Sequence, residues 1–262
     1  MIQLIATDMD GSLLNSRKEL PPRFPALLKA LHMRGIRFAV SSGRQYTNLL
    51  GLFPDLADEL IFIAENGAVI FEQGKNIYTG AMREDGVRKL VEEIRLLPGV
   101  QFILCGTKAA YIGQDQDPDF ARMFYTSLEI LEDLFSVFER DQVCKIAVFC
   151  ENAEHSLYPI LRRYETKYKV CLSGDSWVDL MMPEVSKGSA LRCLQERYAI
   201  PPENCMAFGD YLNDLEMMQA CGESCAMGNA HPALKEASKY VIRSNDEDGV
   251  VEEILRRLEI EL

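Results

Sequence analysis

The chain has 262 residues, of which 48% are hydrophobic and 26% are charged, and its formal net charge is −12. This length suits one large domain or two modest domains, and the composition is that of an ordinary globular protein. The negative charge disfavours nucleic acid or an anionic membrane as the main partner, because both bind basic protein surface. No apolar run reaches membrane-spanning length, so we expect no membrane-bound segment.

Eight cysteines are spread along the chain without a Cys-x-x-Cys pair. Cys221 and Cys225 lie close together, but no second pair or histidine cluster completes a zinc site around them. The beginning of the chain shows no basic and apolar leader segment. We therefore expect reduced thiols in the core of a cytoplasmic protein.

The first third of the chain alternates strand-like and helix-like segments. The predicted strands are residues 2–7, 36–40 and 60–64, and the predicted helices are residues 21–34 and a segment through residue 52. This order predicts parallel strands joined by right-handed crossovers. Ligands bind at the carboxyl ends of such strands, which is where Asp8, Ser42 and Asn66 lie.

The most informative stretch follows the first strand directly and reads Asp8-Met9-Asp10-Gly11-Ser12. Residues i and i+2 of a strand share a face, so the two carboxylates can converge on one point. Buried carboxylates require a positive partner, and two that converge indicate a divalent cation or a nucleophile with an acid and base partner. Alone, the pattern is also compatible with solvated aspartates at a strand end.

The middle of the chain has a different pattern, in which short strands and helices are mixed. The predicted strands are residues 68–71, 76–79, 100–104, 109–112, 143–150, 170–172 and 178–182, with helices around residues 87–94 and 157–168 and a polar loop at residues 114–119. Such a mixture predicts an α+β insert with an antiparallel sheet.

The last third returns to the pattern of the first. The predicted helices are residues 189–198, 212–220, 232–237 and 250–258, and the predicted strands are residues 205–208, 224–227 and 240–242. The chain is therefore predicted to have an α/β fold, in which a Rossmann-like parallel-sheet core domain (residues 1–81 and 184–262) is interrupted by an α+β domain (residues 82–183).

Four polar clusters fall at matching places of this predicted sheet. They are Asp8 with Asp10, Ser42-Gly43-Arg44, Ser186-Lys187-Gly188, and Gly209-Asp210 with Asn213-Asp214. With these motifs the chain resembles the haloacid dehalogenase superfamily of phosphohydrolases, and more narrowly the Cof-type phosphatases with a type-two (IIB) cap. Further matches are Glu65-Asn66-Gly67-Ala68, Pro183-Glu184-Val185-Ser186-Lys187-Gly188, Met227-Gly228-Asn229-Ala230 and Ser244-Asn245-Asp246-Glu247-Asp248-Gly249.

The resemblance implies a Mg²⁺-dependent phosphatase that hydrolyses small phosphorylated metabolites, most often sugar phosphates. It implies that Asp8 is the nucleophile, that Asp10 is the acid and base, and that an aspartyl-phosphate forms. The implied Mg²⁺ ligands are the carboxylates of Asp8 and Asp210 and the backbone carbonyl of Asp10. The implied phosphate-binding groups are the backbone amides of Met9 and Gly43 and the side chains of Ser42, Lys187 and Asn213. Asp214 is expected to orient its neighbours, and direct ligation by Asp214 is the less favoured alternative.

Each of these residues also has a simpler explanation. Lys187 alone suggests a solvated lysine at a helix start, Ser42 and Asn213 suit helix caps, and Asp214 suits a first helical turn. Arg44 is expected to form a structural ion pair, and we leave it outside the site.

The resemblance also implies that the insert covers the active site as a cap. The candidate contacts in the cap are Lys108, Arg122, Tyr125 and Lys145, although surface solvation is the more common explanation for each. Two functions remain as alternatives: a phosphosugar mutase of the same superfamily, and a non-catalytic regulatory or binding protein that has kept the fold. Either a monomer or a homodimer is compatible with the sequence.

Overall fold

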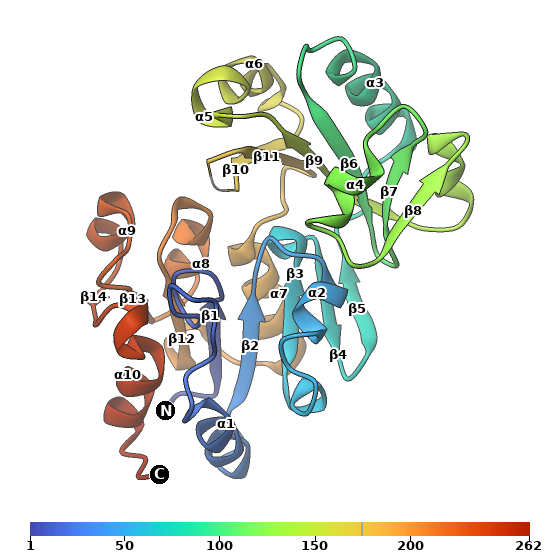
Figure 1. The fold of residues 1–262 in the computed structure, drawn as a ribbon. Coiled ribbons are helices and arrows are strands. Elements are labelled where there is room, and N and C mark those ends of the chain that lie inside the picture. The colour runs from blue at the N-terminus through green and yellow to red at the C-terminus, as the bar shows by residue number, and fades with distance from the viewer. Residues whose placement is uncertain (174) are drawn as a thin grey trace.

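The computed structural model describes residues 1–173 and 175–262. Two β-sheets organise these residues and lie one above the other (Figure 1). Both ends of the chain contribute to the lower sheet, so the two termini lie in the lower part (Figure 1). We call the lower sheet with its helices the core and the upper sheet with its helices the cap.

The core sheet has eight strands in the order β14-β13-β12-β1-β2-β3-β4-β5. The strands from β14 to β3 run parallel, whereas β4 and β5 continue the sheet in antiparallel pairing. The strands are β1 (Leu4–Asp8), β2 (Arg37–Ser41), β3 (Ile61–Ala64), β4 (Val69–Glu72), β5 (Lys75–Thr79), β12 (Cys205–Gly209), β13 (Glu223–Ala226) and β14 (Tyr240–Val241).

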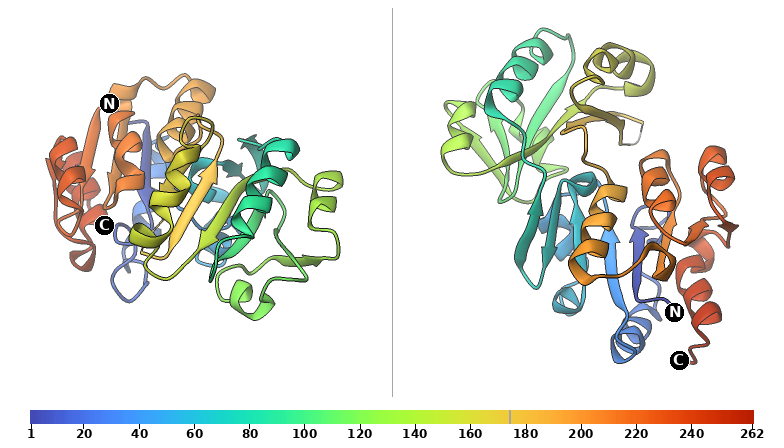
Figure 2. Two further views of the ribbon diagram at one scale, coloured as in Figure 1. Left: turned by 90° about the horizontal axis from the view of Figure 1, so that it is seen from above. Right: turned by 180° about the vertical axis from the view of Figure 1, so that it is seen from behind.

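Helices cover both faces of the core sheet. They are α1 (Phe24–Met33), α2 (Tyr46–Leu50), α7 (Lys187–Tyr198), α8 (Leu215–Gln219), α9 (Pro232–Ala237) and α10 (Gly249–Leu258). α1 contacts α10 on one face, and α7 contacts α8 on the other, as the front and rear views show (Figures 1 and 2). Because helices lie on both sides, all residues of β1, β3 and β12 are buried, as is usual for central parallel strands.

The cap sheet has six strands in the order β10-β11-β9-β6-β7-β8. The strands are β6 (Gln101–Gly106), β7 (Ala110–Gly113), β8 (Leu128–Leu131), β9 (Val143–Phe149), β10 (Lys169–Leu172) and β11 (Trp177–Met181). The cap helices are α3 (Glu84–Ile94), α4 (Pro118–Arg122), α5 (Ala153–Ser156) and α6 (Tyr158–Leu161). A hydrophobic cluster separate from that of the core fills the space between α3 and this sheet.

The predicted α/β fold class is confirmed, while the domain boundaries at 82 and 183 stay predictions. The cap differs locally from the expectation. β7 and β8 pair in parallel, so the cap sheet is not wholly antiparallel, and β8 was not predicted. The helix predicted over residues 157–168 is present but shorter than expected: α6 ends at Leu161 and continues as a tighter 3₁₀ turn to Tyr164. The predicted polar loop contains the start of α4, whose first amides are capped by the side chain of Asp117.

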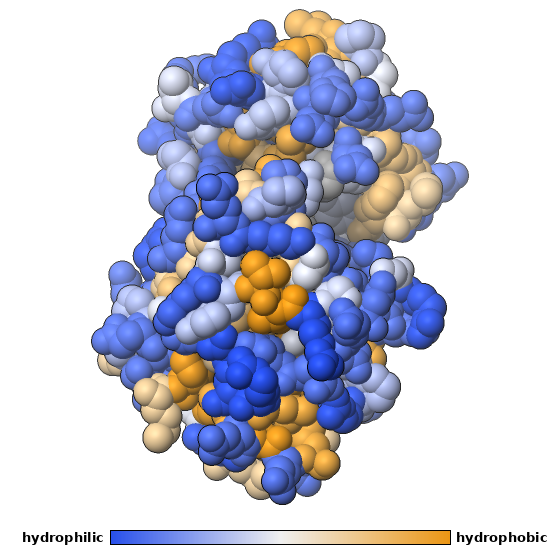
Figure 3. Space-filling view, turned by 90° about the vertical axis from the view of Figure 1, so that its left-hand side faces the viewer, coloured by the Kyte–Doolittle hydropathy of each residue, from blue (hydrophilic) through white to orange (hydrophobic). Residues whose placement is uncertain are grey.

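All eight cysteines are free; four of them (Cys105, Cys144, Cys205 and Cys225) are buried and the other four are partly exposed, so half of the thiols lie in the core as expected. Within the described residues, no helix has the length and apolar character needed to cross a membrane. The surface in Figure 3 is mostly hydrophilic, with small separate hydrophobic patches, in keeping with the many charged residues of the sequence.

Candidate active site

The carboxyl ends of neighbouring core strands bring the predicted site residues together. Asp8 is the last residue of β1, where it pairs in register with Ser41 at the end of β2. Asp210 follows β12, which pairs with β1 on its other side. The parallel topology therefore gathers residues that lie about two hundred positions apart in sequence at one edge of the sheet.

Lys187 lies at the centre of this edge. Its Nζ donates to Asp8 Oδ1 over 2.5 Å and to Asp214 Oδ1 over 2.7 Å, and the residue is 1% exposed. Ser186 caps α7 and forms a reciprocal capping box with Ser189, which fixes Lys187 as the first residue of the helix. The simpler explanation of Lys187 as a solvated lysine is wrong. Although burial acts to lower the pKa of Lys187, the charges of Asp214 and Asp8 raise it above its ordinary value.

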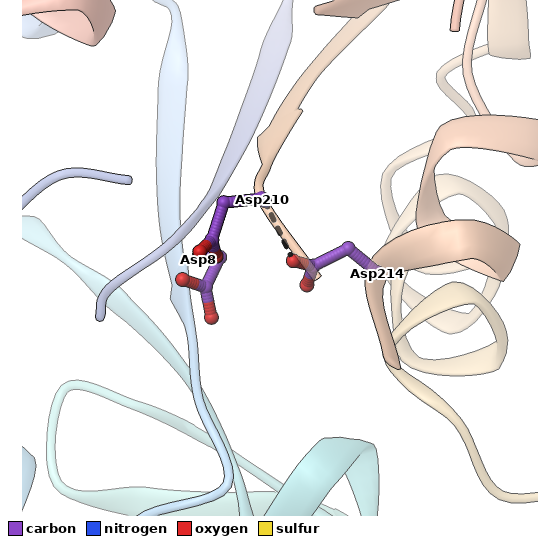
Figure 4. Close-up of side chains that lie close together, drawn as sticks. All are labelled: Asp8, Asp210 and Asp214. Carbon is purple, nitrogen blue, oxygen red and sulfur yellow. Dashed lines mark hydrogen bonds between the residues drawn. The ribbon is translucent and has the colours of Figure 1, made fainter. Parts of the chain in front are cut away.

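Three carboxylates surround this single ammonium group. One oxygen from each of Asp8, Asp210 and Asp214 lies within 4.8 Å of the others (Figure 4). Burial raises the pKa of Asp8 well above its ordinary value, against the opposing charge of Lys187. Burial, followed by the charge of Asp214, raises the pKa of Asp210 to about 6. The protein alone therefore supplies too little positive charge for this cluster.

The contacts of the three carboxylates indicate which of them can bind a metal ion and which one holds its neighbours in place. Asp214 is fully engaged, because its second oxygen accepts the backbone amide of Asp210 over 3.1 Å (Figure 4) and that of Tyr211 over 3.2 Å. Asp8 Oδ2, by contrast, is buried and has no hydrogen-bond partner among the described residues. Asp8 and Asp210 thus offer hard oxygen atoms that fit Mg²⁺, while Asp214 holds Lys187 and the Asp210 backbone in place.

The stretch Asp8-Met9-Asp10-Gly11-Ser12 packs closely against Asp210 at Gly11. Gly11 has φ of +86°, and a Cβ added there would lie 2.2 Å from Asp210 Oδ2. Only glycine combines this backbone conformation with so close an approach.

Asp10 has a different environment from Asp8. Its carboxylate accepts from Arg44 Nε over 2.8 Å and from Arg44 Nη2 over 2.5 Å, and Lys18 Nζ lies 2.8 Å away. Burial acts to raise the pKa of Asp10, but the hydrogen bonds and charges of Arg44 and Lys18 bring it below its ordinary value. Arg44 does form the expected ion pair, yet the pair lines the cavity rather than lying outside the site. The sequence analysis left Arg44 outside the site and did not name Lys18 as a partner of Asp10.

A cavity of about 600 Å³ opens over this edge of the sheet. Of the predicted site residues, those that line it are Asp8, Asp10, Ser42, Gly43, Asp210 and Asn213, whereas Met9, Lys187 and Asp214 lie behind the wall. The Asn213 amide donates to Asn66 Oδ1 over 3.1 Å. The Ser42 hydroxyl accepts the Arg44 amide over 3.2 Å. The structure thus places all the predicted residues at or directly beneath one cavity, and their roles stay predictions.

The opposite wall of the cavity comes from the cap, and two of the four cap candidates belong to it. Lys145 and Tyr125 line the cavity and are 2% and 7% exposed, so surface solvation is the wrong explanation for both. Lys108 and Arg122 are exposed, as expected for solvated side chains.

Lys145 connects the cap to the core. Its Nζ lies 2.5 Å from Glu65 Oε2 and 3.4 Å from Asp179 Oδ2, and it donates to the Gly43 carbonyl over 3.0 Å. Burial acts to lower the pKa of Lys145, but the charges of Asp179 and Glu65 raise it well above its ordinary value. Burial raises the pKa of Glu65, in spite of the neighbouring ammonium. Gly43, which the sequence predicts as a phosphate-binding residue, is therefore in direct contact with a cap side chain.

Side-chain amides form a second set of bonds between cap and core. Asn66 donates to Asp179 Oδ2 over 2.6 Å. Gln45 pairs with both the amide and the carbonyl of Ser127, and Asn48 donates to the carbonyl of Phe124 over 2.6 Å. These contacts join the cap to the core beside the cavity. Of the core residues that make them, only Asn66 belongs to a motif that the sequence analysis named, Glu65-Asn66-Gly67.

Comparisons with known proteins extend over both the core and the cap. A family model described as haloacid dehalogenase-like hydrolase matches residues 5–254. The 5-amino-6-(5-phospho-D-ribitylamino)uracil phosphatase YbjI of Escherichia coli strain K12 is 35% identical over 264 residues, which covers 97% of this chain and 95% of that protein. The crystal structure of SMU.1108c from Streptococcus mutans UA159 has 30% identity and a TM-score of 0.88, covering 99% of this chain and 100% of that one. The subclass IIB sugar phosphatase BT4131 of the same superfamily has 22% identity and a TM-score of 0.82, with coverage of 98% and 100%, and shows the same fold.

Proposed function

The chain belongs to the haloacid dehalogenase-like hydrolases and is a phosphoric monoester hydrolase, and we propose that it is Mg²⁺-dependent and acts through a phosphorylated Asp8. The observation that carries the proposal is the state of Asp8: Lys187 holds one carboxylate oxygen, while the other is buried beside the cavity and has no hydrogen-bond partner within residues 1–173 and 175–262. A fixed carboxylate with one unengaged oxygen suits attack on phosphorus, provided that its charge and that of the phosphate are offset.

The residues divide the chemistry between them. Asp8 forms a bond to phosphorus while the bond from phosphorus to the alcohol oxygen breaks, and Asp10 gives that oxygen its proton. Water then attacks the phosphorus of the aspartyl-phosphate, Asp10 takes a proton from the water, and inorganic phosphate and free Asp8 result. Ser42, Asn213 and the Gly43 amide bind the phosphate oxygens, and Lys187 offsets negative charge throughout.

The acid role requires Asp10 to be released from Arg44, which holds it ionised in the structure. A phosphate dianion that enters the same cavity offers Arg44 a second anionic partner. Substrate binding and release of Asp10 are therefore linked in this proposal.

The metal ion would be held by the carboxylates of Asp8 and Asp210 and by the backbone carbonyl of Asp10. When bound, Mg²⁺ supplies positive charge to the phosphoryl oxygens. The excess of carboxylates over cations around Lys187 and the buried oxygen of Asp8 support this assignment.

For the substrate we propose a small phosphorylated metabolite of the sugar-phosphate class, including sugar-alcohol phosphates. The relative from E. coli is named for a phosphoribityl compound, which is a phosphorylated sugar alcohol linked to a pyrimidine. We further propose that the protein acts in the cytoplasm, which its eight free cysteines support, and that it is a monomer or homodimer.

Release of inorganic phosphate from a panel of phosphorylated metabolites tests the proposal, with wild type and Asp8→Asn compared in Mg²⁺ and in EDTA. We expect Asp8→Asn to lose roughly 10³-fold or more of kcat, because the nucleophile is gone. Full turnover by Asp8→Asn would contradict the mechanism, and no phosphate release from any compound would favour a non-catalytic protein. Retention of phosphate on a bisphosphorylated product in a single turnover would identify a mutase instead.

A further inference from the structure

Two motifs noted in the sequence have no role in the site described so far. Met227-Gly228-Asn229-Ala230 follows β13, and Ser244-Asn245-Asp246-Glu247-Asp248-Gly249 follows β14. These two strands pair in parallel at one side of the core sheet (Figure 1), so the loops after them meet at the carboxyl edge that also carries the proposed catalytic residues. Asn229 and Asn245 nevertheless lie outside the lining of the cavity.

The side chains of Asn229 and Asn245 form a continuous hydrogen-bonded connection to the segment that follows Asp10. Asn245, which is 6% exposed, donates through Nδ2 to the Leu14 carbonyl over 3.0 Å, and its backbone amide donates to Asn229 Oδ1 over 3.1 Å. Asn229 Nδ2 donates to the Gly11 carbonyl over 2.8 Å. Because Asn229 Oδ1 accepts a backbone amide, the side-chain amide is oriented with its donor toward Gly11. The two side chains thus hold the carbonyl groups at both ends of this short segment.

The segment held in this way belongs to a turn that closes on the chain around Asp10. We call residues 9–14 the Asp10 turn. The Leu14 amide donates to the Met9 carbonyl over 2.8 Å, and Asp10 and Leu14 form a β-bridge. A shift of the held carbonyl groups would therefore move the backbone from which the Asp10 carboxylate projects.

Asp246, the residue after Asn245, holds the chain just beyond the Asp10 turn. Its carboxylate accepts from the Ser16 amide and from the Ser16 hydroxyl, each over 2.8 Å. Two residues further along the chain, Lys18 Nζ donates to Asp10 Oδ1 over 2.8 Å. The loop after β14 therefore holds both the turn that carries Asp10 and the segment that carries its partner Lys18.

The position of this turn matters because of the proton that Asp10 is proposed to transfer. As Asp8 bonds to phosphorus and the bond from phosphorus to the ester oxygen breaks, Asp10 gives its proton to that oxygen, which requires hydrogen-bonding distance between them. A displacement of about 1 Å in such a group can cost on the order of 10²-fold in rate. The proton matters most for a poor leaving group, because an alkoxide is a far stronger base than a stabilised phenolate.

We propose that Asn229 and Asn245 are positioning residues for Asp10: by holding the carbonyl groups of Gly11 and Leu14, they keep the Asp10 carboxyl group aligned with the ester oxygen. They act through the backbone of the Asp10 turn and do not touch the substrate. The inference rests on the proposed phosphatase function and adds to it the residues that fix its acid.

Two esters with different leaving groups test this inference. p-Nitrophenyl phosphate releases a phenolate that needs no proton, whereas p-nitrobenzyl phosphate, one methylene longer, releases an alcohol that does. Release of inorganic phosphate gives kcat/KM, which reports the transfer of the phosphoryl group to Asp8. We expect Asn229→Ala and Asn245→Ala to lower kcat/KM about tenfold for the benzyl ester and less than about twofold for the phenyl ester. Similar losses for both esters, or no loss for the benzyl ester, would overturn the inference.

Combined substitutions test whether the effect passes through Asp10. Asp10→Asn alone should lower kcat/KM for the benzyl ester on the order of 10²-fold or more, because the acid is lost. When Asn229→Ala is added to Asp10→Asn, kcat/KM should change less than about twofold for either ester, because the group that Asn229 positions is already gone. A further tenfold loss would show that Asn229 acts by another route, which would overturn the inference.

Asn76→Ala is the matched control for Asn229→Ala. Asn76 is also exposed, and its side chain likewise accepts one backbone amide, that of Tyr78 over 3.0 Å, and donates to one oxygen, Thr79 Oγ1 over 2.8 Å. It lies on β5, at the opposite edge of the core sheet from β14, so both esters should react as in wild type. Asn245 is buried, so Asn245→Ala should also lower stability, and Asn229→Ala decides the outcome if Asn245→Ala does not fold.

Amide hydrogen exchange separates this inference from the proposed function. The amides of the Asp10 turn should exchange faster in Asn229→Ala and Asn245→Ala than in wild type, and at the wild-type rate in Asn76→Ala. Hydrolysis by wild type with equal losses for both esters would overturn the inference alone. If wild type hydrolysed neither ester, the proposed function would fail. Faster exchange of the turn would then still support its positioning by the two asparagines, and unchanged exchange would overturn it.

Discussion

Lys187 and Lys145 are both almost fully buried, each lies between two carboxylates, and both lie near predicted phosphate-binding residues. All partners of Lys187 come from the core, whereas Lys145 belongs to the cap and contacts Glu65 of the core. The first lysine thus connects carboxylates within one part of the molecule, and the second joins two parts.

The Lys187 cluster and the Lys145 cluster also differ in what can neutralise their excess negative charge. The Lys187 cluster contains Asp210, which is partly exposed at the cavity, so that a cation can reach it. Glu65 and Asp179 beside Lys145 are 1% and 2% exposed, and burial raises the pKa of Glu65, which favours a proton instead. Similar charge patterns are therefore compatible with the proposed metal site in one place and with a contact neutralised by a proton in the other.

The largest effect is expected from Lys187→Met. Removal of the ammonium leaves three carboxylates at the reacting centre, so kcat should fall on the order of 10²–10³-fold, and the free energy of unfolding should fall by about 3–5 kcal/mol because a buried pair is broken. Phosphate release and urea unfolding measure these effects. Lys108→Met changes an exposed lysine in the same way and should behave as wild type. A Lys187→Met enzyme with near-normal kcat would show that the Lys187 cluster is not the reacting centre.

Lys145→Met should have a smaller effect on stability than Lys187→Met. It leaves Glu65 and Asp179 buried together, but Glu65 can take up a proton, so we expect the free energy of unfolding to fall by about 2–3 kcal/mol. The added substitution Glu65→Gln removes one of the two carboxylates beside Lys145 and should recover part of this loss in a double-mutant cycle. Additive losses from the two substitutions would mean that the pair carries no coupling between cap and core.

Gly11→Ala tests whether the close contact between Gly11 and Asp210 matters for stability and for metal binding. Gly35→Ala is its control. Both glycines have positive φ, but an added Cβ contacts Asp210 at Gly11, whereas at Gly35 no heavy atom of the described part of the chain lies within 4 Å of it. Gly35→Ala should cost about 1 kcal/mol of unfolding free energy from backbone strain, and Gly11→Ala about 2 kcal/mol. Only Gly11→Ala should also weaken Mg²⁺ binding in calorimetry, and equal metal affinities for the two variants would argue against Asp210 as a ligand.

The smallest expected effect is the pH dependence of Mg²⁺ binding. Burial and the charge of Asp214 raise the pKa of Asp210 to about 6, and the metal ion requires the ionised carboxylate. Below that pH a proton on Asp210 competes with Mg²⁺, so the apparent affinity should rise about tenfold or more from pH 5 to pH 7, because Asp8, whose pKa is also raised by burial, must be ionised as well. Calorimetric titration at a series of pH values measures this change. A constant affinity across that range would indicate that the metal ion does not bind at Asp210.

Much of the core site could be predicted because it depends on topology. Once the strands alternate with helices, Asp8, Ser42 and Asp210 must lie at one edge of a parallel sheet. The orientation of Asp10 toward Arg44 could not be predicted, because it depends on side-chain geometry within that edge.

The cap is harder to predict because its contacts are distant in sequence and have no periodic pattern. The bond from Lys145 to the Gly43 carbonyl spans 102 positions, and a lone lysine in a strand gives no sign that it is buried. The extended segment of β8 and the break in the helix predicted over residues 157–168 likewise follow from local packing and not from hydrophobic periodicity alone.

One short turn touches both lysine clusters. Glu65, Asn66 and Gly67 all have positive φ, with values of 50°, 56° and 97°. Glu65 reaches Lys145, while a Cβ added at Gly67 would lie 2.2 Å from the carbonyl oxygen of Ser186, the residue before Lys187. A one-residue insertion or deletion in this turn would shift the neighbours of both ammonium groups at once. Chain length should thus be fixed between β3 and β4, even in homologues whose cap loops differ in length.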